Sequence, residues 1–188
     1  MQNEFLKPGK SATPSAMTRD RFATAVVVLI LCGCLSAAPS GEPSNRRLSV
    51  ETIWAGTQCG CEDRQPRVRW VTDRNQLTAA LAAAGSRALN NRLAQYSMDW
   101  RRNGLVWIDM GLKPTGGYAL SLAGPAATLS ADVAVITVRW RQPRSGSIVT
   151  QQLTAPCLLV RMERGDVHTI RIEDEDGRKR ADLQINRN

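Results

Sequence analysis

Short runs of alternating apolar and polar residues fill the chain from Leu105 to its end, and they restrict the possible folds more than any other feature. The runs are residues 105–110, 118–122, 134–141, 158–162 and 168–172. Successive side chains of a β-strand point to opposite faces, so a period of two predicts strands. We therefore expect an α+β protein that is mainly β. It would be an antiparallel curled sheet or a small sandwich, with one or two helices at its N-terminal end.

Two turns are expected among these runs. Asp176-Gly177 favours a two-residue type I′ hairpin turn between residues 170–172 and 183–185. This hairpin places acids at 173–175 opposite bases at 178–180, so opposite charges can meet across the strands. Residues 142–147 have a turn composition, and we expect residues 148–153 to return as a paired strand. Because the charges can pair, the net charge of +8 does not predict a nucleic-acid partner.

Residues 48–97 predict a strand and helix segment ahead of the β domain. Residues 48–54 and 68–71 have the composition of short strands. A helix follows, for which Thr72 can serve as the cap. Apolar residues at helical spacing are Leu77, Ala80, Leu81 and Ala84. Residues 89–96 suggest a second, looser helical stretch.

The N-terminus has the parts of a secretory signal: a basic region, an apolar run at residues 22–31, and small residues. The run is shorter than the roughly 18 to 20 residues of a permanent membrane helix. Leu31-Cys32-Gly33-Cys34 resembles a bacterial lipobox, which predicts a lipoprotein signal peptide at 1–33 and lipidation of Cys34. Ordinary cleavage after Ala38 is the alternative.

Two expectations about location follow. Leu35 is the kind of residue that outer-membrane lipoproteins usually show after the lipidated cysteine, so we expect an anchor in the outer membrane. Residues 34–47 are rich in Ser, Ala, Pro and Gly, which predicts a flexible tether. Residues 98–188 would then form the main β domain at the end of this tether.

Few residues are available for catalysis or metal binding. His168 is the single histidine, which excludes zinc and iron sites that need two histidines from this chain. Beyond the leader, the cysteines are Cys59, Cys61 and Cys157, and we expect one disulfide, Cys59–Cys157 or Cys61–Cys157. A Cys157–His168 nucleophile is a minor alternative. We expect no enzyme activity, no catalytic residue, no metal and no cofactor.

A run of motifs resembles the protease complex subunit PrcB family. The motifs are Met98-Asp99-Trp100, the strand from Gly104 to Gly111, the turn Lys113-Pro114-Thr115-Gly116-Gly117-Tyr118, and Thr154-Ala155-Pro156-Cys157-Leu158-Leu159-Val160. The resemblance extends from Met98 to about Glu173 and concerns the C-terminal domain of that family. In the family an aromatic residue often stands where this chain has Cys157. The resemblance implies a lipoprotein subunit that accompanies a surface serine protease.

The turn at residues 113–118 is the candidate protein-binding site, with two readings. It is either a structural turn whose Tyr118 packs in the core, or a binding rim with Tyr118 as an anchor. Its Thr-Gly-Gly-Tyr sequence also resembles, distantly, the loop of chagasin-type protease inhibitors. We therefore expect a lipid-anchored envelope protein that binds another envelope protein, such as a protease, as a non-catalytic accessory subunit. The alternative is a protease inhibitor that uses this loop.

Overall fold

The computed structural model describes residues 45–185 of the chain. The predicted signal peptide, Cys34 and most of the expected tether lie outside the described residues. The described residues fall within one compact unit, Ser40–Asn188. Within this part of the chain, no helix is both long and apolar enough to cross a membrane.

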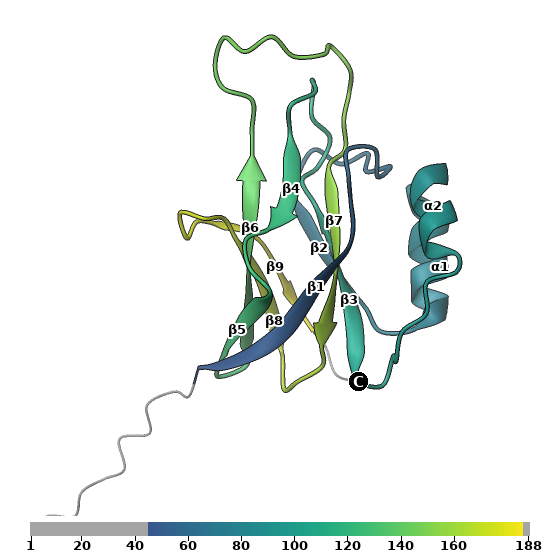
Figure 1. Cartoon of the computed structure of the whole chain (residues 1–188), viewed down its shortest axis with the longest axis vertical. Coiled ribbons are helices and arrows are strands. Elements are labelled where there is room, and N and C mark those ends of the chain that lie inside the picture. Colours follow the sequence, from purple (N-terminus) through teal and green to yellow (C-terminus); the bar gives the residue numbers. More distant parts are fainter. Residues whose placement is uncertain (1–44, 186–188) are drawn as a thin grey trace, which may run out of the picture. The chain divides into compact units, whose positions relative to one another are not determined.

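Most of this unit is one sheet (Figure 1). The described elements are β1 (Arg46–Gly56), β2 (Arg67–Val71), α1 (Arg74–Ala84), α2 (Arg87–Leu93), β3 (Asn103–Asp109), β4 (Ala119–Leu122), β5 (Ala126–Ser130), β6 (Val133–Arg141), β7 (Cys157–Glu163), β8 (Thr169–Glu173) and β9 (Lys179–Gln184). The strand order is β2-β3-β7-β1-β5-β6-β8-β9, and β4 pairs with β6. The first strand of the chain therefore lies in the middle of the sheet.

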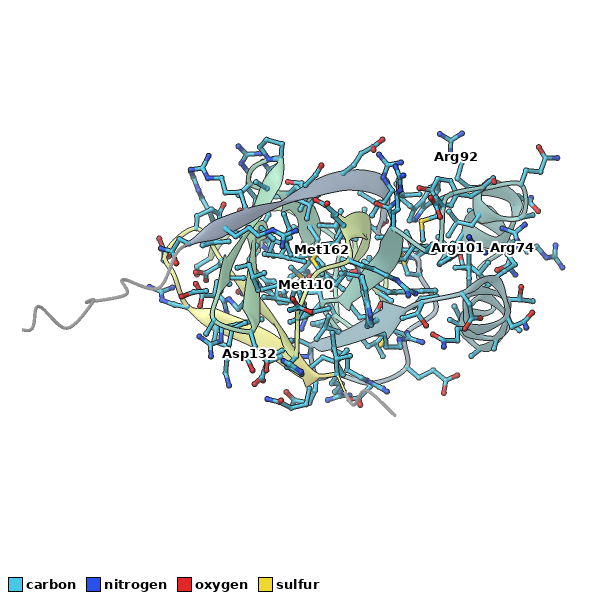
Figure 2. The ribbon with its side chains drawn as sticks, turned by 90° about the horizontal axis from the view of Figure 1, so that it is seen from below. Arg74, Arg92, Arg101, Met110, Asp132 and Met162 are labelled. Carbon is cyan, nitrogen blue, oxygen red and sulfur yellow. A yellow bond between two sulfur atoms is a disulfide. The ribbon has the colours of Figure 1, made fainter. Side chains whose placement is uncertain are left out.

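The sheet curls until its two outer strands, β2 and β9, approach each other, so it is nearly closed. Its strand pairs are antiparallel apart from β6 and β8, which run parallel. The predicted mainly β fold is confirmed, and of the two architectures the curled sheet is present. The interior holds the larger core, in which Met110 and Met162 are fully buried (Figure 2).

The two helices cover the outer face of β3 and β7. Leu77 on α1 and Leu89 on α2 pack with Leu105, Trp107 and Leu159 from these strands. Both faces of β3 are therefore buried. Its side chains point alternately into the interior core and into the core beneath the helices, and neither set faces solvent. Helix α1 begins after Asp73, whose carboxylate accepts a hydrogen bond from the Gln76 N–H at 2.8 Å. The cap is thus Asp73 and not Thr72, one residue later than predicted.

The predicted return strand at residues 148–153 is wrong, because these residues are in no strand. Both edges of the end of β6 are already occupied. On one side β4 pairs with this part of β6, and Leu120 lies opposite Trp140. On the other side the Trp140 N–H donates to a carboxylate oxygen of Glu175 at 3.1 Å. Residues 142–156 therefore cross to β7 as a long irregular loop.

Two smaller differences concern the start of β1 and a strand that was not predicted. Arg46 and Arg47, expected at the end of the tether, pair with Leu129 and Thr128 of β5. Strand β5 itself was not predicted, since the small residues around Gly124-Pro125 obscure its alternation.

Candidate functional site

The predicted binding turn, residues 113–118, lies between β3 and β4 and is called the rim turn. It runs beside the β6–β7 connection, of which residues 142–154 are called the projecting loop; together they form the rim (Figure 1). The backbones of Lys113 and Thr154 exchange two hydrogen bonds, at 2.7 and 3.0 Å. The Thr154 hydroxyl also donates to the Thr115 carbonyl at 2.8 Å. The rim turn is thereby fixed along the base of the projecting loop.

The two glycines of the rim turn allow the loops to touch. The Gly116 N–H donates to the Thr150 carbonyl at 2.9 Å, and a Cβ at Gly116 would lie 2.3 Å from the Thr150 hydroxyl. Gly117 has φ of +86°, a conformation that glycine adopts without steric cost. A Cβ at Gly117 would lie 3.2 Å from both Pro143 and Val149. Because Gly116 and Gly117 have no side chains, the rim turn can thus pack directly against the projecting loop.

Tyr118 is half-buried and packs against the interior core, as the structural reading of this turn predicts. The Lys113 ammonium lies 6.0 Å from the centre of the Tyr118 ring. Burial lowers the pKa of Lys113, while the neighbouring Cys61 acts in the opposite direction. Of the six predicted site residues, Pro114 and Gly117 are the exposed ones.

The projecting loop carries the exposed apolar side chains that the sequence analysis missed. Ile148 is fully exposed and Leu153 is 59% exposed, and they are the large exposed hydrophobic residues of the described chain. The loop has no helix or strand of its own, and the tip turns where the Ser147 N–H donates to the Arg144 carbonyl at 3.1 Å. The sequence predicted a paired strand at residues 148–153, so the exposure of these two side chains was not expected.

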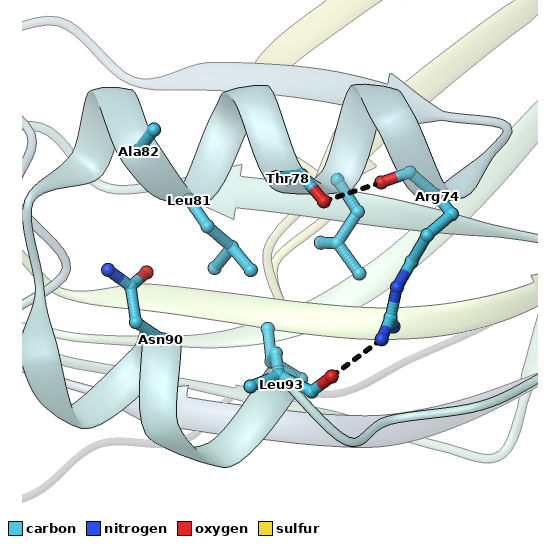
Figure 3. A pocket seen from close by; sticks show the side chains of 8 residues that line it. Arg74, Thr78, Leu81, Ala82, Asn90 and Leu93 are labelled. Carbon is cyan, nitrogen blue, oxygen red and sulfur yellow. Dashed lines mark hydrogen bonds between the residues drawn. The ribbon is translucent and has the colours of Figure 1, made fainter.

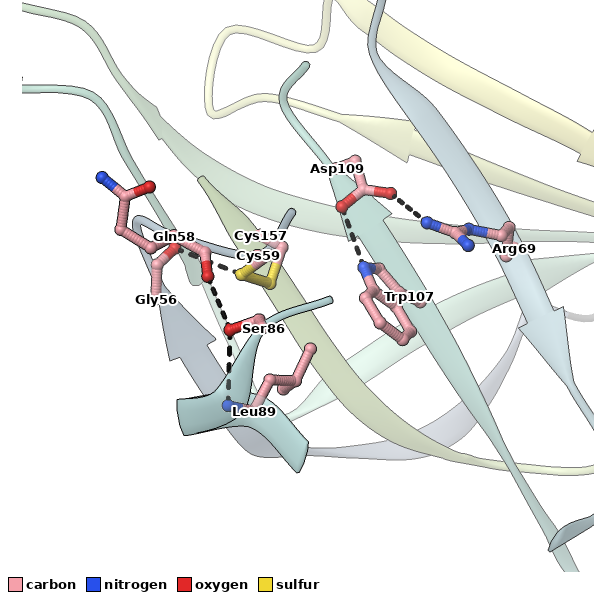
Figure 4. Close-up of a disulfide and its surroundings, with 9 residues drawn as sticks. All are labelled: Gly56, Gln58, Cys59, Arg69, Ser86, Leu89, Trp107, Asp109 and Cys157. Carbon is pink, nitrogen blue, oxygen red and sulfur yellow. Dashed lines mark hydrogen bonds and ion pairs between the residues drawn. A yellow bond between two sulfur atoms is a disulfide. The ribbon is translucent and has the colours of Figure 1, made fainter. Parts of the chain in front are cut away.

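A disulfide secures the base of the rim. It joins Cys59, in the segment after β1, to Cys157 at the start of β7 (Figure 4). This is one of the two predicted pairings, and Cys61 is the free cysteine. Both bonded cysteines are buried in the core beneath the helices.

Hydrogen bonds extend this link in two directions. The Ala155 N–H donates to the Thr57 carbonyl at 2.8 Å, and the Gln58 side chain donates to the Leu153 carbonyl at 3.1 Å. The Ser86 hydroxyl, which caps α2, donates to the Gln58 carbonyl at 2.8 Å. The segment after β1 therefore connects the projecting loop to the helices.

Asp109 is the most buried carboxylate of the described chain, and its role is structural. It accepts hydrogen bonds from the Trp107 indole and from the Arg69 guanidinium, both at 2.8 Å (Figure 4). The same guanidinium lies 4.7 Å from the centre of the Trp107 ring. Paired in this way, the carboxylate ties β2 to β3 below the rim.

A pocket of about 360 Å³ lies between α1 and α2 (Figure 3). Its walls include Leu77, Leu81 and Leu93. The Arg74 guanidinium closes one end by donating to the Ala94 carbonyl at 2.5 Å. The pocket is mainly apolar, and the structure shows nothing that would occupy it.

The minor alternative of a Cys157–His168 nucleophile is wrong. Cys157 is in a disulfide, so it has no thiol to activate. Strand β7 pairs with β1 and β3, whereas β8 pairs with β6 and β9, so the two residues are not on neighbouring strands as expected. His168 is exposed, and its Nδ1 lies 3.5 Å from Asp132. Among residues 45–185, no three His, Cys, Asp or Glu side chains are grouped closely enough to hold a metal ion.

Together, the fold and the rim define a mainly β domain with a nearly closed sheet that presents two linked loops at one end. The family model described as PrcB C-terminal matches residues 105–163, and the chain therefore contains a PrcB C-terminal domain. The match begins in β3 and ends in β7, and it includes the rim turn and the projecting loop. No curated protein and no solved structure matches the chain. The family indicates, at most, an accessory role beside a protease complex.

Proposed function

We propose that this chain is an exported lipoprotein, anchored in the outer membrane through Cys34, and a non-catalytic accessory subunit that binds a protease complex of the envelope. The observation that carries the proposal is the family match at residues 105–163, because this segment supplies both loops of the rim. The rim turn is fixed to the projecting loop at Lys113, Thr115 and Gly116. A binding surface held in one conformation loses little entropy when a partner binds.

Two features support export. The leader has the parts of a secretory signal, and Cys34 stands in a lipobox-like sequence. The Cys59–Cys157 disulfide fits an oxidising compartment outside the cytosol.

Strand β1 runs from the N-terminal side of the domain to the rim. Strand β1 begins at Arg46 at one end of the sheet, and its last residue, Gly56, pairs with Cys157 at the base of the rim (Figure 1). Ten residues of extended strand span roughly 33 Å. The rim therefore lies at the end of the sheet opposite to the end where β1 begins.

Labelling with a radioactive or alkyne-tagged fatty acid tests the anchor. We expect Cys34→Ser to abolish labelling and to release the protein from the outer-membrane fraction. The matched control, Cys32→Ser, should retain both. Labelling that survives Cys34→Ser, or a soluble wild-type protein with an unacylated N-terminus, would contradict the anchor.

Co-purification tests the accessory role. The tagged full-length protein is isolated from mildly crosslinked envelopes, and a protease is expected among the proteins that mass spectrometry identifies. The activity of this protease is then compared with and without the chain. Unchanged or increased activity supports an accessory subunit, whereas stoichiometric loss of activity would make the chain an inhibitor. The absence of any protease would reject both.

A further inference from the structure

The projecting loop has the length of a functional loop. Residues 142–156 connect β6 to β7 without helix or strand. Irregular connections longer than about 12 to 15 residues are uncommon in compact domains and are usually functional or disordered. This loop is held on both sides, by the rim turn at Gly116 and Lys113 and by the segment after β1 at Thr57 and Gln58. It therefore combines unusual length with a defined conformation.

The contacts of the loop leave its apolar side chains unused by the fold. Pro143 and Val149 lie against Gly117, while Ile148 beside them is fully exposed. Leu153 is 59% exposed although its carbonyl accepts a hydrogen bond from Gln58. A single exposed apolar residue needs no explanation, but two on one fixed loop form a candidate contact surface.

The charged side chains within the rim have one sign. Lys113 and Arg144 lie within the rim and Arg141 at its edge, and the rim residues include no Asp or Glu. Within residues 45–185, no ion pair forms to Arg141 or Arg144. Of the neighbouring acids, Asp63 is paired with Arg67 at 2.8 Å, and the Glu175 carboxylate accepts a hydrogen bond from the Trp140 N–H at 3.1 Å. The rim is therefore cationic around an apolar centre.

We propose that the projecting loop is the contact surface, with Ile148 as its anchor, and that the partner is a protein with an apolar pocket bordered by Asp or Glu side chains. This inference rests on the proposed function and adds the chemistry of the partner. Complementary charge selects an acidic border and raises the rate of encounter.

The test places a photocrosslinking amino acid at one position at a time in the full-length protein in native envelopes. The positions are Ile148, Leu153 and, as a control, the exposed Ala79 of α1. We expect the same protein to be captured from Ile148 and Leu153 and not from Ala79, through a peptide that contains Asp or Glu. The captured protein is then purified, and its binding is measured with Ile148 variants.

Ile148→Asp should weaken this binding at least tenfold, equivalent to about 1.4 kcal/mol, because an acid would face an apolar pocket with an acidic border. Ile148→Val should change it less than threefold. Arg144→Glu should also weaken binding, and this loss should shrink at high salt, where charges are screened. Equal binding by wild type and Ile148→Asp would overturn the inference.

Other outcomes separate this inference from the proposed function. Capture from Ala79 alone, with a protease as the product, would overturn the loop as the contact and leave the accessory role in place. Capture of a second copy of the chain, or Ile148-dependent binding to vesicles of phosphatidylethanolamine and phosphatidylglycerol, would overturn the proposed partner. No capture at any position, together with no co-purified protease, would reject both proposals.

Discussion

The β8–β9 hairpin and the projecting loop both connect strands, but they use their side chains in opposite ways. In the hairpin, Asp174 is buried and accepts hydrogen bonds from the backbone of Asp176 and Arg178 and from the Arg180 guanidinium. In the projecting loop, Ile148 is fully exposed, and Arg144 has no ion-pair partner within the described residues. The hairpin pairs its buried carboxylate internally, whereas the loop leaves an apolar side chain and a cation exposed to solvent.

The largest expected effect concerns the covalent link at the base of the loop. Replacing Cys59 and Cys157 together by Ser should lower the free energy of unfolding by about 4 kcal/mol, since the bond closes a chain segment of 98 residues. Urea unfolding followed by circular dichroism measures this change. Cys61→Ser, which removes the free cysteine, is the control and should be nearly neutral. Equal stability of the double variant and wild type would mean that hydrogen bonds alone hold the loop.

A somewhat smaller effect is expected at Gly60. This residue has φ of +73°, and a Cβ would lie 1.5 Å from the Ala84 carbonyl oxygen at the end of α1. Gly60→Ala should cost about 3 kcal/mol, because backbone must move as well as adopt a strained φ. Gly146 in the projecting loop and Gly177 in the hairpin also have positive φ, but no atom lies within 4 Å of their Cβ positions. Ala at either should cost only about 1 kcal/mol, and thermal unfolding of the three variants makes the comparison.

The hairpin should show an acid-dependent stability that the projecting loop lacks. Burial alone would raise the pKa of Asp174, but hydrogen bonds from Arg178, Arg180 and Asp176 outweigh it and lower the pKa below 3.8. A lowered carboxyl pKa stabilises the folded state above the unfolded value, and this contribution is lost as the pH falls below 3.8 toward the folded value.

Asp174→Asn should therefore cost about 2 kcal/mol at pH 7, and the difference from wild type should shrink as the pH is lowered toward 3. Denaturant unfolding at a series of pH values measures this. The exposed Asp176 provides the control, since its Asn variant should differ little from wild type at any pH. A constant difference for Asp174→Asn across the series would contradict the assignment.

The smallest expected effect on stability is at Ile148. Because its side chain is fully exposed, Ile148→Asp should change the free energy of unfolding by less than about 0.5 kcal/mol. Thermal unfolding provides the measurement. A larger loss would show that Ile148 contributes to the fold, and the contrast between loop and hairpin would no longer hold.

The same contrast explains which parts of the structure could be predicted from the sequence. The hairpin was predictable because the glycine turn and the flanking alternation are local signals, and Ile170 does pair with Leu183. Its turn is not the predicted two-residue type I′ turn, which needs a positive φ at both Asp176 and Gly177. Of the two, Gly177 alone has a positive φ, and the turn is longer, since the Gly177 N–H donates to the Asp174 carbonyl at 3.0 Å. The absence of the return strand at 148–153 was not predictable, since it depends on β4 and Glu175, which approach β6 from distant parts of the chain. The rim turn was located by its motif, but the contact of Gly116 with Thr150 depends on tertiary structure that composition does not encode.

The central position of β1 has a consequence for how the chain is made. The start of β1 pairs with β5, but Val50 pairs with Met162, so β1 cannot complete its pairing until β7 is made, 162 − 50 = 112 residues later. At roughly 5 to 20 residues per second, synthesis of that length takes roughly 6 to 22 s. During this interval β1 lacks its partner on one side, so the centre of the sheet can form only near the end of synthesis.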